Sequence, residues 1–265
     1  MRAMPALPAP SLPVVAALRS VPALLLALLL ALLFALLFAL VFALLTMPLS
    51  AAEAPAAPIP TGAADAPAAD GGQPTTRALA AYEAGETEEA QRLFLLSARA
   101  GNALAAYNAA VIRLNDESAT PDEQAALALL LQSAQAGFAT AQHMLGTLFE
   151  NGQFLPVSQE QAVKWYRLAA EQGVADAQAA LATQYYLGRG AARDLAEAAR
   201  WYAMAAEAGD AGAQYILASM YEKGLGVVAD LEEALAWYNS AARQGDLAAQ
   251  YKAREVVERL AAERQ

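Results

Sequence analysis

The stretch AQYILASMYEKGLGVVADLEEALAWYNSAARQGD, residues 213–246, decides the fold of this chain of 265 residues. Its motif ALAWY at 234–238 has two earlier relatives, AVKWY at 162–166 and AARWY at 198–202, and each step between them is 36 residues. The same step separates a set of glutamines that follow alanine and a set of glycines: Gln142, Gln178, Gln214 and Gln250, and Gly101, Gly137, Gly173, Gly209 and Gly245. A constant period of this size is typical of solenoid proteins.

Each unit predicts a hairpin of two helices. In the segment DAQAALATQYYL, residues 176–187, apolar side chains recur every fourth position, which favours one buried helix face. Gly188 and Gly190 follow and are expected to end this first helix, because glycine tolerates the left-handed conformation. The second helix carries the Trp-Tyr pair. Its alanines allow close approach of the partner helix, and the aromatic rings fill the remaining space.

The second helix of each unit has a recognisable start. A capping residue is followed three positions later by Glu or Gln, as at Ser158, Asp194 and Asp230. In a weaker earlier unit, Thr120 and Glu123 are expected to do the same, with Pro121 at the first helical position. The step thus yields clear units at about 139–174, 175–210 and 211–246, the weaker unit before them, and a leading helical pair near 77–100.

The full pattern, AQxxLGxxYxxGxGVxxDxxxAxxWYxxAAxxGD, resembles the Sel-one-like repeat (SLR), a relative of the tetratricopeptide repeat (TPR). The resemblance covers about residues 77–250. It implies an all-α, right-handed superhelical solenoid of antiparallel helix pairs, which presents a concave surface to other proteins. Residues 247–265 are expected to form a capping helix, since a terminal repeat needs cover.

Two departures from the family pattern affect the expected geometry. Phe154, Leu155 and Pro156 replace the Gly-x-Gly-Val loop of one unit, and Ala182 and Ala218 replace an expected glycine. The loop geometry of that unit is therefore in question, while the fold is not.

The amino-terminal part predicts export. Residues 23–45, ALLLALLLALLFALLFALVFALL, contain no polar side chain, and a helix of this length measures about 34 Å, enough to cross a bilayer. Only Arg2 and Arg19 are basic before it, which places the amino terminus in the cytoplasm and the remainder beyond the membrane. Residues 1–52 are thus a signal peptide or a signal anchor, with the apolar helix at about 21–45. Both alternatives stay open, so the folded part is expected to be periplasmic or otherwise extracytoplasmic, either soluble or anchored.

Residues 53–76 are rich in proline and alanine and lack an apolar face, which indicates a disordered, flexible linker. Beyond the apolar segment the chain carries 15 basic and 27 acidic groups, a net charge of −12. This sign disfavours nucleic acid and favours a protein partner with basic segments. The chain has no cysteine and one histidine, so we predict no metal site and no cofactor.

Binding residues are expected where the repeats differ. In the first helices, which line the concave side in the related fold, these positions lie opposite Leu145 and Phe149. The expected groove wall comprises Tyr107, His143, Thr147, Glu150, Thr183, Tyr186, Tyr215, Ser219 and Glu222. Tyrosine is a favoured interface residue. No catalytic residues are predicted, because Ser219 has no recognisable histidine partner.

We therefore expect an exported, non-enzymatic protein–protein interaction scaffold or regulator of the bacterial cell envelope. Its partner would bind on the concave face, and a membrane would be contacted only through an uncleaved amino-terminal helix. The alternatives are a cell-wall-directed hydrolase of the SLR type and a passive structural spacer.

Overall fold

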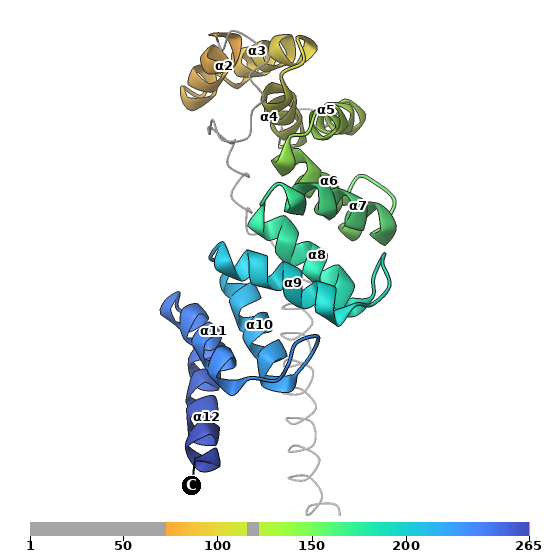
Figure 1. Cartoon of the computed structure of the whole chain (residues 1–265). Helices are drawn as coiled ribbons and strands as arrows, with labels where there is room; N and C mark the ends of the chain where they lie inside the picture. The colour runs from red at the N-terminus through yellow and green to blue at the C-terminus, as the bar shows by residue number, and fades with distance from the viewer. Residues whose placement is uncertain (1–72, 116–121, 265) are drawn as a thin grey trace, which may run out of the picture. The chain divides into compact units, whose positions relative to one another are not determined.

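The computed structural model describes residues 73–115 and 122–264. All regular elements in these ranges are α-helices (Figure 1). In chain order they are α2 (Gln73–Glu83), α3 (Thr87–Arg99), α4 (Ala103–Leu114), α5 (Glu123–Gln135), α6 (Ala139–Asn151), α7 (Gln159–Glu171), α8 (Ala175–Leu187), α9 (Leu195–Glu207), α10 (Ala211–Lys223), α11 (Leu231–Arg243) and α12 (Leu247–Glu263). None of these helices is both long enough and apolar enough to cross a membrane. The predicted amino-terminal apolar helix lies outside the described residues.

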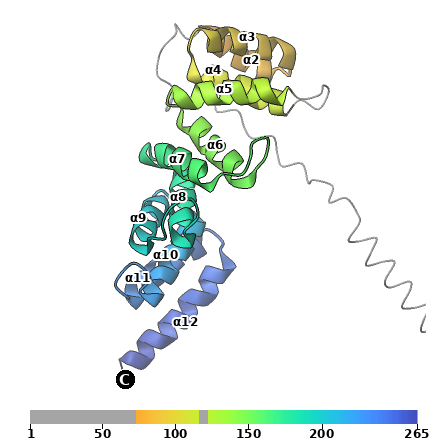
Figure 2. The ribbon, with the colours of Figure 1, turned by 90° about the vertical axis from the view of Figure 1, so that its right-hand side faces the viewer.

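Within the described part, successive helices pack against one another in sequence order (Figures 1 and 2). The leading pair is α2 with α3. Four units follow, α4 with α5, α6 with α7, α8 with α9 and α10 with α11, and α12 packs on α11. The prediction of an all-α solenoid of helix pairs is confirmed.

The repeated residues form the core, as the sequence indicates. Leu145, Leu181 and Leu217 of the first helices are at most 2% exposed. The tyrosines of the Trp-Tyr pairs are equally buried: Tyr166, Tyr202 and Tyr238. The tryptophans occupy the same position in α7, α9 and α11 and pack on the core clusters of the stack. The buried tyrosine ring of each clear unit therefore fills space that the surrounding alanines leave open.

The predicted caps of α7, α9 and α11 are present. The side chains of Ser158, Asp194 and Asp230 accept hydrogen bonds from backbone N–H groups in the first turn of each helix. The earlier unit differs, because α5 begins at Glu123 and its cap is Asp122, whose carboxylate accepts from the Ala125 N–H at 3.1 Å. The expected cap at Thr120 lies outside the described residues.

The loops between paired helices approach the preceding second helix closely. Gly190 and Gly226 have φ of +67° and +73°, and a Cβ on either would lie 2.1 Å from a backbone carbonyl oxygen, that of Gln159 or Leu195. Phe154 takes the equivalent place one unit earlier and keeps the left-handed conformation, with φ of 62°. Its side chain packs against the first core cluster. The departure in sequence thus leaves the backbone conformation at this position unchanged.

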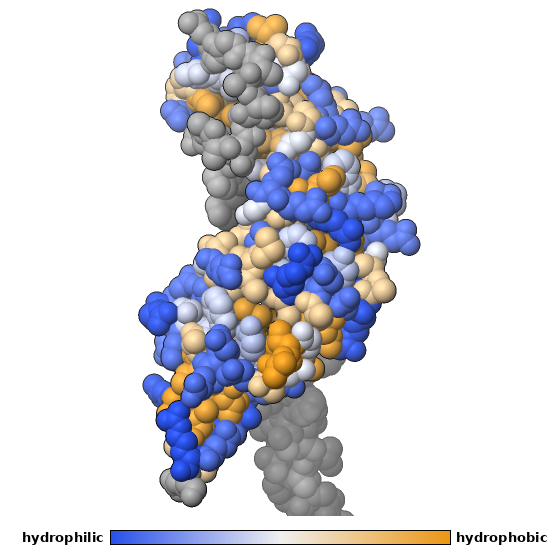
Figure 3. Space-filling model, viewed as in Figure 1, coloured by the Kyte–Doolittle hydropathy of each residue, from blue (hydrophilic) through white to orange (hydrophobic). Residues whose placement is uncertain are grey.

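One expected boundary shifts. Helix α2 begins at Gln73, so residues 73–76 belong to it and not to the linker. Thr75 is buried, and its hydroxyl lies 2.7 Å from that of Ser97, which ties this turn to α3. The predicted cap, α12, is one continuous helix that buries Ala249, Ala253 and Val256. Val257 of α12 remains 50% exposed. Apolar surface lies among charged residues on the face of the molecule drawn in Figure 3.

Candidate partner-binding face

The expected wall residues fall into three sets along α6, α8 and α10. The step of 36 residues relates His143 to Tyr215 across two units, with Ala179 between them. It also relates Thr147, Thr183 and Ser219, and in the third set Glu150, Tyr186 and Glu222. All of these residues except Ala179 were expected on the wall. Apart from Glu222, whose side chain is covered, they are half-buried.

The second set consists of the hydroxyl side chains of Thr147, Thr183 and Ser219, and it contacts the second helix of its own unit. Thr183 Oγ1 lies 2.8 Å from the hydroxyl of Tyr202, and Tyr166 donates to Thr147 Oγ1 at 3.3 Å. Ser219 holds the same position relative to Tyr238, and it partly opposes the rise in the pKa of that tyrosine that burial causes. These hydroxyls therefore help to fix the helix pair and are not free to bind a partner.

Glu150 lies at the centre of a polar cluster between α6, α7 and α8. Its Oε2 accepts from the Tyr166 hydroxyl at 2.6 Å, and its Oε1 accepts from Gln184 Nε2 at 2.7 Å. Burial, and then the hydrogen bond to Glu150, raise the pKa of Tyr166 well above its usual value, so the tyrosine stays a donor. Both groups that contact the carboxylate are neutral.

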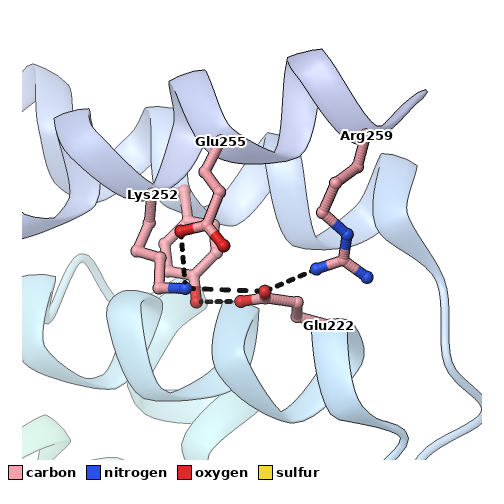
Figure 4. Close-up of polar contacts among 5 residues, drawn as sticks. Glu222, Lys252, Glu255 and Arg259 are labelled. Carbon is pink, nitrogen blue, oxygen red and sulfur yellow. Dashed lines mark hydrogen bonds and ion pairs between the residues drawn. The ribbon is translucent and has the colours of Figure 1, made fainter. Parts of the chain in front are cut away.

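Glu222 has the same place two units later but different partners (Figure 4). Its Oε2 accepts from the Tyr238 hydroxyl at 2.9 Å, while Oε1 lies 2.7 Å from Arg259 and 3.6 Å from Lys252. The pKa of Lys252 is raised, chiefly by its hydrogen bond to Glu255 and also by Glu222. The carboxylate of α10 thus anchors the capping helix α12.

Two residues are not on an exposed wall, contrary to expectation. Tyr107 is 4% exposed and packs on Phe138, with ring centroids 5.3 Å apart, because α4 is buried along almost its whole length. The side chain of Glu222 is only 6% exposed, since α12 covers it. The prediction failed there because it treated the first and last units like inner ones.

His143 packs on the ring of Tyr166, with centroids 5.7 Å apart. Burial lowers its pKa, and the carboxylates of Asp176 and Glu150 oppose that shift. The imidazole is therefore a largely neutral part of the wall. In the described part of the chain, no group of three or more His, Asp or Glu side chains could hold a metal ion.

Sequence reasoning missed the partners of the wall residues. The tyrosines of the Trp-Tyr pairs were assigned to packing alone, yet their hydroxyls contact Thr147, Glu150 and Thr183. Gln184 was overlooked, although it carried a signal: the step of 36 residues aligns it with Leu148 and Met220, so a polar side chain occupies an apolar slot.

Comparison with protein families identifies four Sel1 repeats, at residues 103–138, 139–174, 175–210 and 211–246. The chain belongs to the Sel1 repeat family. The weaker unit before residue 139 is therefore a Sel1 repeat as well. Comparison with curated protein sequences gives no match.

Two of the solved structures that resemble this Sel1 repeat chain are about 30% identical to it. A Sel1 repeat protein from Oxalobacter formigenes is 30% identical, with a TM-score of 0.60, and the match covers 66% of this chain and 75% of that one. A protective antigen of uropathogenic Escherichia coli with an SLR fold is 31% identical, with a TM-score of 0.58 over 60% of this chain. This chain spans only 34% of the length of the antigen.

Proposed function

We propose that the chain is an exported, non-enzymatic interaction protein of the bacterial cell envelope, which binds a protein partner on the face formed by α6, α8 and α10. Repeat proteins of the Sel1 and TPR type are generally protein-interaction scaffolds. The apolar segment at 23–45 and the likeness to a protective antigen support export. The net charge of −12 beyond that segment favours a partner with basic segments.

One observation supports this proposal most directly: the buried residues of the units are constant, while the partly exposed residues that pack on them vary from unit to unit. The buried tyrosines keep their place in every clear unit, while the set that packs near them changes from His143 to Ala179 to Tyr215. Tyr215 packs on Tyr238 as His143 packs on Tyr166. Variation on a fixed scaffold is what a surface selected for one partner requires.

Site-specific photo-crosslinking in intact cells tests the proposal. A benzoylphenylalanine at Tyr186, on α8, should give a discrete protein adduct. The same probe at Leu168, which is 45% exposed on α7, is the control and should give none. Adducts of equal intensity from both positions, or none from either, would contradict a binding face on the first helices. A passive spacer would give no dependence on position.

A further inference from the structure

Glu150 and Glu222 form a matched pair within one chain. They are separated by two repeats, and so are the tyrosines that donate to them, Tyr166 at 2.6 Å and Tyr238 at 2.9 Å. The frame around each carboxylate is thus the same. Differences between the two environments therefore come from the helix that follows each unit.

At Glu222 that helix is α12, and it supplies positive charge. Figure 4 shows Lys252 and Arg259 pointing to the carboxylate from one side of α12. Arg259 forms the closer ion pair, at 2.7 Å. The chain itself therefore demonstrates that this kind of site accepts a guanidinium and an ammonium group together.

At Glu150 the following helix is α8, whose one charged residue is the acidic Asp176, so α8 supplies no positive charge. The positions two repeats before Lys252 and Arg259 are Ala180 and Leu187. Within residues 73–115 and 122–264, Glu150 makes no ion pair. Among the described residues, its carboxylate receives hydrogen bonds only from Tyr166 and Gln184.

The cluster also holds more acceptors than donors. Gln184 is fully buried, and because its Nε2 donates to Glu150, its Oε1 faces elsewhere and has no donor among the described residues. A carboxylate offers about four acceptor sites, of which two are used here. A half-buried carboxylate with neutral partners gains from a cationic donor, which makes shorter and stronger hydrogen bonds than a neutral one.

We infer that Glu150 is the docking point for a lysine or arginine side chain of a partner protein, which takes the place that Arg259 takes at Glu222. The inference rests on the proposed function and adds the chemistry of the partner. Leu187 is the residue that the repeat aligns with Arg259, and it is 46% exposed, so it offers apolar surface for the stem of such a side chain. Both requirements, a charge and a flexible apolar stem, are met by lysine and arginine alone among the common residues.

The test uses the full chain and a labelled peptide. The probe is a fluorescein-labelled nonapeptide in which four arginines alternate with alanines, and its control replaces each arginine with neutral citrulline. Fluorescence anisotropy at a fixed salt concentration measures both affinities. The wild-type chain should bind the arginine peptide more tightly, and Glu150→Gln should weaken that binding about tenfold, the loss expected for a charge-assisted hydrogen bond.

Three further variants distinguish a specific site from general electrostatic attraction. Glu207→Gln removes the same charge from an exposed position of α9 and should change the affinity less than about twofold, because exposed charges act weakly at a distance. Leu187→Arg places a cation where α12 carries Arg259, so it should satisfy Glu150 internally and abolish the preference for arginine over citrulline. Leu187→Gln controls for the lost leucine and should keep the preference.

The inference is overturned if Glu207→Gln weakens binding as much as Glu150→Gln, if Leu187→Arg binds as well as wild type, or if the wild type does not prefer arginine to citrulline. The proposed function fails separately. If the probe at Tyr186 gives adducts and Glu150→Gln binds the arginine peptide as tightly as wild type, the binding face stands and only the cation site is refuted.

Discussion

The loop glycines predict a measurable difference between two substitutions that look alike in sequence. Gly226→Ala places a Cβ 2.1 Å from the carbonyl oxygen of Leu195, in a residue with φ of +73°. Gly209→Ala meets nothing within 4 Å, although its φ is +99°. Both variants carry the cost of a left-handed alanine, about 1–2 kcal/mol, but only the first must also separate the loop from the start of α9.

Overpacking of this kind costs about 1–3 kcal/mol. We therefore expect Gly226→Ala to lower the free energy of unfolding by about 2–5 kcal/mol and Gly209→Ala by about 1–2 kcal/mol. Gly190→Ala should match Gly226→Ala, because its Cβ would also lie 2.1 Å from a carbonyl oxygen. Urea unfolding of the full chain, followed by far-ultraviolet circular dichroism, measures the three values. Equal losses for all three variants would refute the close contact between neighbouring units.

Further predictions concern α12, the buried hydroxyls and pH. Arg259→Ala should destabilise the chain by about 1 kcal/mol, because its ion pair is partly exposed, and should speed amide hydrogen exchange in α12. Arg254 is exposed on the same helix and forms no ion pair within the described residues, so Arg254→Ala should leave that exchange unchanged. Tyr166→Phe removes a hydrogen bond to a carboxylate and should cost about 1.5–3 kcal/mol in urea unfolding, against about 0.5–1.5 kcal/mol for Tyr202→Phe, whose hydroxyl contacts a threonine. Burial lowers the pKa of His143 below its usual 6.5, so in this range the unfolded chain binds more protons than the folded one. The free energy of unfolding should therefore fall as the pH drops through 6.5 toward the folded pKa. A His143→Gln variant whose unfolding free energy shows the same pH profile in that window would contradict this.

The fold was predictable because its determinants are local and repeated. Each Trp-Tyr pair, capping residue and terminal glycine recurs at a constant step, so one reading applies to every clear unit. Phe154 shows the limit of that reasoning. The sequence put its loop in question, while the backbone there keeps the left-handed conformation that glycine adopts in the other units.

The candidate face was only partly predictable, because burial depends on contacts between units. The position of Glu150 followed from the repeat, yet its neutral partner Gln184 comes from the next unit along the stack. The same cause explains the errors at Tyr107 and Glu222, whose surroundings belong to the two ends of the repeat array. The repeat therefore predicts where a residue lies on its helix, but its neighbours in the adjoining unit are known only from the structure.

The packing of each helix chiefly on its sequence neighbours has a consequence for folding. Contacts that are close in sequence need little loop closure, so the array should fold fast for its size and lose structure one unit at a time from its ends. At the carboxyl end, that first step breaks an electrostatic latch between α10 and α12. Added salt would then weaken the attachment of the last repeat, while the stability of the inner repeats, which rests on apolar packing, would change little.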